Sequence, residues 1–381
     1  MTTDPHRRKA LDAAKTLVVK VGTRVLTRVD GMLDRERIAC LADQLCQVMD
    51  TGRNAVLVSS GAVGAGVGKL GLDQRPRGLA DLQAVAAIGQ TELIQAYEQA
   101  FAVHGRHVAQ VLLTAEDLRN RSSYLNVRNA LRQVSELGAI PIVNENDCVA
   151  VDELMTTFGD NDRLAASVAG LMNDCLLVIL SDVDGLYDGN PADPESRIVP
   201  LVPEIDDSVW SLARDSANSV SKGGMSSKLS AAQTATSHGH HVIIAPGRDD
   251  RVLEKILAGD AIGTLFKPDP HALRGRRRWI DSAAEVVGKL HVDTGAAAAV
   301  GDRGKSLLAI GIVRVDGVFS QGSVVSIVDP EQNEIARGLI NYPSSEVAQI
   351  LGLPSERIAD VLGHCPYDAV IHRDKIVNCG A

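Results

Sequence analysis

Carboxamide and carboxylate side chains are concentrated in two short stretches, residues 144–147 (Asn-Glu-Asn-Asp) and residues 159–162 (Gly-Asp-Asn-Asp). The first follows an apolar run, residues 139–143, typical of a short buried strand. The second precedes residues 164–171, whose apolar side chains have the spacing of one helix face. In open α/β sheets, strand carboxyl ends and helix amino ends form the crevice that binds ligands. The two stretches therefore predict a polar ligand site, although Asn and Asp are also typical of turns and helix caps.

A lysine lies near the end of another apolar run. Residues 16–21 have the composition of a buried strand, and Lys20 stands just before Gly22, where that run breaks. An ammonium group is costly to bury without an anionic partner, so Lys20 is a candidate for binding phosphate. The alternative is an edge lysine whose ammonium group reaches water.

A glycine-rich segment follows the next strand, residues 55–58. It begins with Ser-Ser-Gly-Ala at 59–62 and has further glycines up to Gly71. Glycines let backbone N–H groups approach a ligand, and successive N–H groups can form an anion nest. The formal G-x-G-x-x-G lies several residues beyond the strand, and Leu70 follows Lys69 where a P-loop has Ser or Thr. These features argue against a dinucleotide site and against a P-loop.

Two further segments are suited to a nucleotide. The apolar run 175–180 ends in Ser181 and Asp182, as expected of an interior parallel strand that delivers polar groups to a crevice. Residues 219–229 form a glycine-serine loop with two lysines before an alanine-rich helix, which suits phosphate groups. Turn formation at the first segment and a surface loop at the second are the alternatives.

The intervening segments predict the scaffold. Strands are predicted at 108–113, 241–245 and 263–266, and helices at 35–49, 79–104 and 126–137. This alternation predicts an α/β fold, a three-layer αβα sandwich with a mainly parallel central sheet. From about residue 282 the texture changes to short β-rich runs, such as 306–310 and 323–328, which predict a small carboxyl-terminal β-barrel. We therefore expect a catalytic domain at 1–270, a basic linker at 271–284 and the barrel domain with its tail at 285–381.

Composition narrows the class of protein. The 381 residues are 45% hydrophobic, enough for a large core and a second domain, and the net charge of -9 gives no general reason to bind nucleic acid or anionic membranes. Specific RNA contact by the basic run 274–279 is the minority interpretation of that linker. Six cysteines without metal-ligand spacing suit a reducing cytosol. No signal-like or membrane-spanning apolar run is present, so a cytoplasmic protein is expected.

Taken in order, these motifs resemble the amino acid kinase family, in the branch that phosphorylates L-glutamate. The resemblance covers nearly the whole chain, and the carboxyl-terminal part resembles a PUA domain. The matching motifs are residues 20–23, 59–62, 144–147, 159–162, 181–187, 223–228 and 263–266.

The resemblance implies an ATP-dependent phosphotransferase with a carboxylate acceptor. It would transfer the γ-phosphoryl group of ATP to the side-chain carboxylate of L-glutamate, giving L-glutamyl 5-phosphate for proline biosynthesis. The acceptor is already a nucleophile, so alignment of two anions and charge neutralisation dominate catalysis. Mg²⁺ is expected through the ATP phosphates, and no protein ligand is assigned to it.

The resemblance also assigns roles to residues. Lys20 and Lys228 would contact the phosphates, and Asp162 would hold the two ammonium groups, which otherwise repel each other. The glutamate-binding residues would be Ser60, Gly61, Ala62, Asp147 and Asn161. The ATP-binding residues would be Lys20, Ser181, Asp182, Lys222, Gly223, Gly224, Met225, Ser226, Ser227 and Lys228.

Two positions depart from the family pattern. Arg24 stands where a small hydroxyl residue is frequent, and Lys222 stands where Thr is common before Gly-Gly. Neither change removes an ion-handling residue, and Lys222 is an additional cation. They affect loop detail rather than the class of reaction, and Lys222 either strengthens phosphate binding or points to solvent.

Partners are implied by the resemblance alone. They are L-proline as feedback inhibitor, a second copy of the chain in a dimer or tetramer, and glutamyl phosphate reductase as a channelling partner. Other kinases of this fold act on N-acetylglutamate, aspartate, carbamate or a nucleoside monophosphate; the amine contact expected from Asp147 favours glutamate. An RNA-binding or RNA-modifying protein is the alternative from another class, since PUA domains occur in such proteins. Its binding would weaken steeply with salt.

Overall fold

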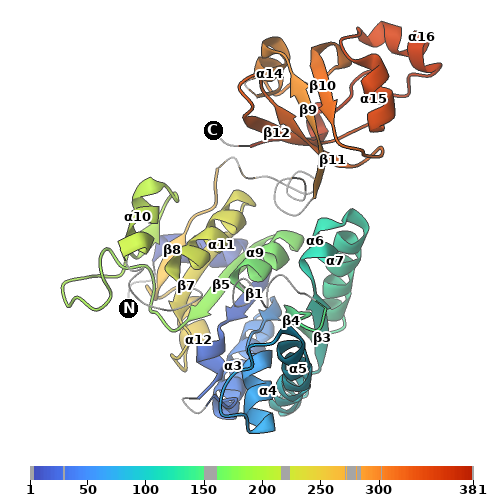
Figure 1. The fold of residues 1–381 in the computed structure, drawn as a ribbon. Helices are drawn as coiled ribbons and strands as arrows, with labels where there is room; N and C mark the ends of the chain where they lie inside the picture. Colours follow the sequence, from blue (N-terminus) through green and yellow to red (C-terminus); the bar gives the residue numbers. More distant parts are fainter. Residues whose placement is uncertain are drawn as a thin grey trace. The chain divides into compact units, whose positions relative to one another are not determined.

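The computed structural model describes residues 4–28, 31–149, 161–215, 224–270, 272, 280, 285–301 and 303–379 (Figure 1). The chain separates into two compact units. One comprises Met1–Leu118 and Ser122–Ala272, and the other comprises Leu273–Ala381 with Arg119–Arg121. Within the described ranges, every helix is too short or too polar to cross a lipid bilayer.

The first unit is built on an eight-stranded sheet with the order β3-β4-β2-β1-β5-β7-β8-β6. Its strands are β1 (Thr16–Val21), β2 (Asn54–Val58), β3 (Val108–Leu113), β4 (Ile140–Glu145), β5 (Cys175–Ser181), β6 (Leu201–Val202), β7 (His241–Pro246) and β8 (Thr264–Phe266). Neighbouring strands are parallel except β7 and β8, which are antiparallel. The mainly parallel sheet is thus confirmed, with β1 between β2 and β5 near its centre.

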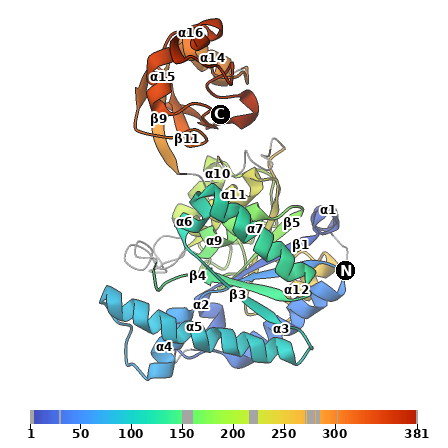
Figure 2. The ribbon, with the colours of Figure 1, turned by 90° about the vertical axis from the view of Figure 1, so that its right-hand side faces the viewer.

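Helices cover both faces of this sheet, which confirms the three-layer αβα sandwich (Figure 2). In this view α3, α4 and α5 lie on one side of the strands, and α7, α9 and α11 lie on the other. The helices are α1 (Pro5–Ala13), α2 (Thr23–Leu26), α3 (Arg35–Asp50), α4 (Ala62–Leu70), α5 (Leu79–Ala102), α6 (Ala115–Arg119), α7 (Arg121–Glu136), α9 (Asn161–Leu171), α10 (Asp207–Asp215), α11 (Met225–Ser237) and α12 (Val252–Ala258).

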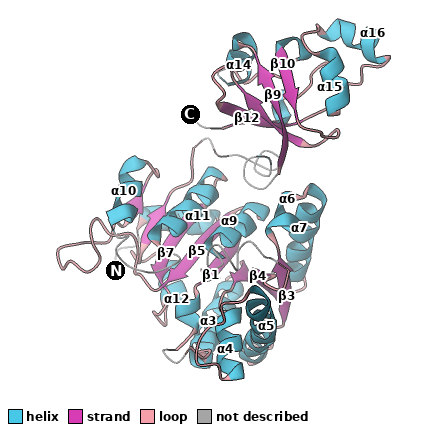
Figure 3. Cartoon of the chain, viewed as in Figure 1, coloured by secondary structure: helices cyan, strands magenta, loops and turns pink. Residues whose placement is uncertain are grey.

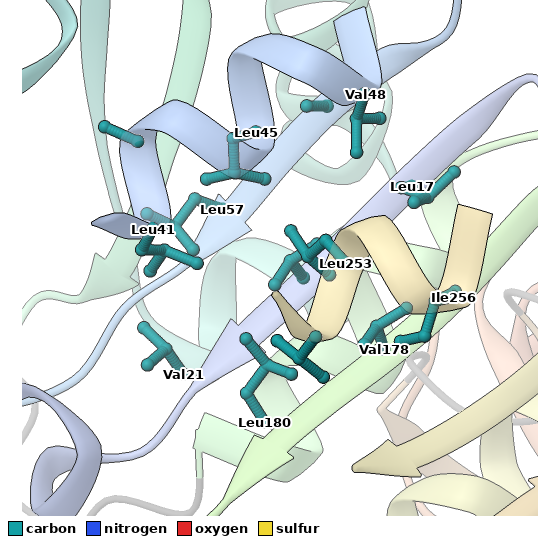
Figure 4. Packing of buried hydrophobic residues seen from close by; sticks show 14 of the residues in the cluster. Leu17, Val21, Leu41, Leu45, Val48, Leu57, Val178, Leu180, Leu253 and Ile256 are labelled. Atoms are coloured by element: carbon teal, nitrogen blue, oxygen red, sulfur yellow. The ribbon is translucent and has the colours of Figure 1, made fainter. Parts of the chain in front are cut away.

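The alternation of side chains along β1 fixes the direction of Lys20. Leu17, Val19 and Val21 join one large core cluster with side chains of α3, α5 and α12. Part of this cluster is drawn in Figure 4. Because successive residues of a strand point to opposite faces, Lys20 points to the other face, where α9 packs against β1. Full burial of each large aliphatic side chain stabilises this arrangement by about 1.5–3 kcal/mol.

The glycine-rich segment is a helix rather than a loop. Residues 62–70 form α4, which crosses α5 at very short range. A Cβ atom at Gly66 would lie 2.0 Å from the carbonyl oxygen of Val85, and one at Gly89 would lie 1.8 Å from that of Ala62. These two glycines therefore serve helix packing, and the expected anion nest is wrong for the interior of α4.

The second unit contains a separate five-stranded sheet with the order β10-β9-β11-β12-β13 (Figure 3). Its strands are β9 (Val286–Val292), β10 (Ile312–Asp316), β11 (Val324–Val328), β12 (Glu334–Leu339) and β13 (Ile376–Asn378), and its α-helices are α14 (Thr294–Gly301), α15 (Ser344–Ile350) and α16 (Ile358–Leu362). β9 and β11 are parallel and the other pairs are antiparallel. The unit has its own core cluster.

One strand prediction in this unit is confirmed and one is wrong. Residues 323–328 match β11, but residues 306–310 are not a strand. Leu307 makes a single bridge to Ile371, and Ala309–Gly311 is a 3-10 turn. Gly311 packs closely against Ala296, since a Cβ atom at Gly311 would lie 2.3 Å from the Cβ atom of Ala296.

Candidate active site

Two lysines and one aspartate form a buried ionic cluster. Lys20 Nζ lies 2.5 Å from Asp162 Oδ1, and Lys228 Nζ lies 3.5 Å from Asp162 Oδ2. The side chains of Lys20, Asp162 and Lys228 are only 9%, 1% and 7% exposed. Buried charges need partners, and here one carboxylate lies between two ammonium groups.

Three elements far apart in the sequence bring this cluster together. Lys20 lies near the end of β1, Asp162 lies in the first turn of α9, and Lys228 lies in the first turn of α11. A carboxylate is favoured at a helix amino end, where backbone N–H groups are unpaired. Helices α9 and α11 pack against each other, which brings Asp162 and Lys228 together.

The charge state of Asp162 follows from its neighbours. Burial by itself raises the pKa of Asp162, but the ammonium groups of Lys20 and Lys228 lower it more, and the net shift is downward. The hydroxyl of Ser227 also donates to Asp162 Oδ2 at 3.2 Å. With Asp162 ionised and both lysines protonated, the cluster carries one net positive charge, which suits an anionic ligand.

A buried amide network adjoins the ionic cluster. Asn161 Nδ2 donates to the carbonyl oxygen of Ser59 at 2.6 Å, to Ser60 Oγ at 2.9 Å and to Asn144 Oδ1 at 3.1 Å. Asn144 Nδ2 donates in turn to Gln90 Oε1 at 2.8 Å. The other side-chain atom of Asn161, Oδ1, is buried without a donor among the described residues, as expected where a ligand or a water supplies one.

The turn after β2 presents the next group of expected residues. Ser60 is buried, Gly61 caps α4 and Ala62 is the first residue of that helix. Gly61 has φ of +100°, a left-handed conformation that a residue with a Cβ atom rarely adopts. From α5, the buried hydroxyl of Tyr97 shares a 2.9 Å hydrogen bond with Ser59 Oγ.

Asp147 lies beyond this network, in the turn after β4, and is partly exposed. Burial raises its pKa to about 6, and the positive charge of Arg75 opposes this shift. Asp147 makes no hydrogen bond to Ser60 or Asn161 in the described part of the chain. Arg75, from the segment between α4 and α5, was not among the residues predicted for the site.

Ser181 and Asp182 lie at the end of β5, beside the end of β1. Ser181 Oγ donates to Asp182 Oδ1 at 3.1 Å, and Arg24 Nη1 lies 2.9 Å from Asp182 Oδ2. Burial raises the pKa of Asp182, but hydrogen bonds from Arg24 and Ser181 outweigh this effect and lower it. The carboxylate is therefore ionised and already paired.

The segment 222–228, which is predicted to bind ATP, is only partly described. Lys222 and Gly223 lie outside the described residues. Gly224 precedes α11, and Met225 and Ser226 are the first two residues of that helix, in the same turn as Lys228.

Sequence reasoning missed Gln90 and Tyr97 as supports of the site. The available signal was the position of Gln90 on the apolar face of a long helix, three residues before the buried Leu93. A polar residue on such a face needs a hydrogen-bonding partner, but the sequence does not say which one.

Comparison with known proteins shows the family to which this fold belongs. Residues 15–246 match the model of the amino acid kinase family, and residues 288–362 match that of the PUA domain. The protein is thus a kinase with the αβα fold of that class and carries an additional carboxyl-terminal domain.

Close relatives cover nearly the full length. The glutamate 5-kinase of Rhodopirellula baltica is 58% identical over 371 residues, which are 97% of this chain and 95% of the relative. That of Moorella thermoacetica is 46% identical over 379 residues, 99% of this chain and 100% of the relative. That of Thioalkalivibrio sulfidiphilus is 44% identical over 371 residues, 97% and 98% of the two chains. The chain belongs to the glutamate 5-kinases within the amino acid kinase family.

Proposed function

We propose that the protein transfers the γ-phosphoryl group of ATP to the side-chain carboxylate of L-glutamate. The products are L-glutamyl 5-phosphate and ADP, and the reaction is the first step of proline biosynthesis. The observation that carries this proposal is the buried cluster of Lys20, Asp162 and Lys228, which adjoins the amide network at Asn161 and Ser60. The net positive charge of the lysine cluster is suited to binding a phosphate chain, and the neighbouring amide groups are suited to binding an amino acid.

The chemistry requires alignment and charge neutralisation. The glutamate carboxylate attacks the γ-phosphorus, the bond to the β-phosphate oxygen breaks, and ADP leaves with the bonding electrons. The transition state is loose, and its charge lies on the phosphoryl oxygens and the leaving oxygen. Lys20 and Lys228 bind those oxygens, while Asp162 keeps the two ammonium groups in place before the substrates arrive.

Glutamate binds on the side of the amide network. Ser60 and Asn161 contact its carboxylates, and the backbone N–H groups of Gly61 and Ala62 supply further donors. Asp147 binds the substrate ammonium group, and it must be ionised to do so.

ATP binds toward β5 and α11. Its contacts are with Lys20, Ser181, Asp182 and the segment 222–228. The described residues contain no cluster of three or more His, Cys, Asp or Glu side chains that could hold a metal by itself. We expect the ATP phosphates to carry Mg²⁺, which is how Mg²⁺ commonly binds with nucleotides. When bound, Mg²⁺ neutralises phosphate charge.

The remaining assignments also belong to this proposal. Residues 1–270 form the catalytic domain, 271–284 the linker and 285–381 the PUA-like domain. The family implies cytoplasmic location, inhibition by L-proline, a dimer or tetramer, and channelling to glutamyl phosphate reductase.

The test is glutamate-dependent ADP release by the parent protein and by Lys228→Ala. We expect the substitution to lower turnover by about 100-fold or more, as for loss of a group that stabilises transition-state charge, with unchanged circular dichroism. The matched control is Lys15→Ala, which removes an exposed lysine paired with Asp174. Equal or better turnover of aspartate or N-acetylglutamate would refute the choice of substrate, and normal turnover of Lys228→Ala would refute the site.

A further inference from the structure

Arg24 and Asp182 face each other just beyond the paired ends of β1 and β5. Val21 of β1 is opposite Leu180 of β5, so the residues that follow each strand emerge side by side. Arg24 Nη1 lies 2.9 Å from Asp182 Oδ2. The two residues are 158 positions apart in the sequence.

The backbone of Arg24 is held beside the lysine cluster. Gly22 N donates to the carbonyl oxygen of Leu180 at 3.3 Å, and a Cβ atom at Gly22 would lie 3.7 Å from Lys20 Nζ. Arg24 is only two residues further along the chain. Arg248 Nη2 also donates to the carbonyl oxygen of Arg24 at 2.6 Å. The start of α2 is therefore fixed next to the ammonium group expected to bind phosphate.

The guanidinium group of Arg24 has unused binding capacity. Its side chain is 62% exposed, and that of Asp182 is 37% exposed. Its hydrogen bond to Asp182 uses one nitrogen, and its other nitrogens make no hydrogen bond to any residue that the structure describes. Exposed ion pairs of this kind add little to stability, so holding the fold together is a weak reason for this arginine. A planar group with five N–H donors is well suited to phosphate oxygens.

We propose that Arg24 binds the terminal phosphates of ATP and ADP, with Asp182 orienting its guanidinium group at the edge of the nucleotide site. The inference rests on the proposed function, since it places the phosphate chain beside Lys20. Arg24 is thus an additional nucleotide-binding cation of this chain, and it opposes the charge that builds up on departing ADP.

The test compares Arg24→Ser with the parent in calorimetric titrations with ATP, ADP, AMP and adenosine. We expect binding of ATP and ADP to weaken by about 10-fold or more, the scale of a charge-assisted hydrogen bond. Binding of AMP and adenosine should be unchanged in the same titrations, and KM for glutamate should be unchanged in separate initial-rate assays. Arg24→Lys should recover part of the loss because it keeps the charge without the planar fork.

Two further comparisons make the result decisive. Equal weakening for all four ligands would overturn the proposal, and so would unchanged ATP binding. Arg24→Ser should still weaken ATP binding in an Asp182→Asn background; no additional loss there would mean that Arg24 acts only through Asp182. The control is Arg8→Ser, which removes an exposed arginine 3.2 Å from Asp12 on α1. These titrations contain no glutamate, so they report on Arg24 even if glutamate is not the acceptor.

Discussion

The side-chain oxygen of Gln90 accepts a 2.8 Å hydrogen bond from the amide of Asn144. Asn144 then accepts from Asn161 at 3.1 Å, and Asn161 donates to Ser60 Oγ at 2.9 Å. All four side chains are buried. Helix α5, which contributes no residue to the recognised motifs, thus sets the orientation of the amide that we expect to meet glutamate.

Replacing Gln90 by Met should weaken glutamate binding selectively. The substitution keeps the length of the side chain but leaves the buried amide of Asn144 without its acceptor, at a cost of about 1–3 kcal/mol. Asn144 and Asn161 can then rotate away from the geometry that suits the substrate. We expect KM for glutamate to rise about 10-fold in initial-rate assays, with KM for ATP unchanged.

The matched control for this prediction is Gln95→Met, because Gln95 is exposed on the same helix. It should leave both KM values and the melting temperature unchanged. If Gln90→Met raises KM for both substrates equally, the network supports the whole fold rather than the glutamate side of the site.

Gly89→Ala should destabilise the protein and impair the glutamate site. The added methyl group would lie 1.8 Å from the carbonyl oxygen of Ala62 and 2.3 Å from the backbone nitrogen of Gly66. Backbone atoms cannot move aside cheaply, so α4 must shift away from α5 at a cost of about 1–3 kcal/mol or more. Because α4 begins at the Gly61 turn, we expect a lower urea midpoint together with a higher KM for glutamate.

A second glycine supplies the control for Gly89→Ala. Gly301 lies at the end of α14, has no positive φ, and a Cβ atom there would meet nothing within 4 Å. Gly301→Ala should leave stability unchanged or slightly improved. Equal losses from the two substitutions would show that the close crossing of α4 and α5 is not the cause.

The sequence predicts seven of the eight strands of this sheet because they are short apolar runs that end at polar or glycine residues, whereas β6 has only two residues and was not predicted. A parallel sheet buried on both faces requires continuous apolar strands, and ligand groups collect where they end. The same local reasoning failed for α4. Glycine has low intrinsic helix propensity. The segment is nevertheless a helix, and it packs so closely against α5 that a Cβ atom at Gly66 or Gly89 would clash with neighbouring backbone.

Local sequence patterns did not predict contacts between residues that are far apart in the sequence. Arg24 and Asp182 are 158 positions apart, and Gln90 and Asn144 are 54 apart. Each contact depends on the strand order, which local sequence patterns do not give. Motif resemblance identified Lys20, Asp162 and Lys228, but their distances depend on how α9 and α11 pack on the sheet.

Asp162→Asn should lower both turnover and stability. An amide cannot balance two ammonium groups, and removing one partner from a buried ionic cluster costs about 3–5 kcal/mol. The pKa of Asp162 is lowered in the folded protein, so its stabilising contribution is present above the unfolded value of about 3.9 and is lost as the pH falls through the folded value. Urea unfolding at several pH values should show a constant difference from the parent near neutrality that shrinks below about pH 4.

Asp12→Asn is the control for that experiment, because Asp12 forms an exposed pair with Arg8. Its urea midpoint should match that of the parent at every pH. A difference between Asp162→Asn and the parent that persists unchanged at low pH would mean that the lost charge is not responsible.

The affinity for glutamate should depend on pH through Asp147, whose pKa is raised to about 6 by burial. Below pH 6 this carboxyl group becomes neutral and loses its attraction for the substrate ammonium group. The value of kcat/KM for glutamate should therefore fall toward 10-fold per pH unit below that point, while kcat/KM for ATP should not. Asp147→Asn should remove this dependence and lower kcat/KM at pH 8.

Arg75 provides an independent check of the same assignment, since its positive charge lowers the pKa of Asp147 against the effect of burial. Arg75→Met should move the midpoint of the glutamate profile to higher pH, because burial then acts unopposed. The raised pKa also means that the folded state binds the proton more tightly than the unfolded chain, so ionisation of Asp147 reduces stability as the pH rises from about 4 to 6. Asp147→Asn should abolish that decline in urea titrations. If Arg75→Met leaves the midpoint of the glutamate profile unchanged, Asp147 is not the titrating group.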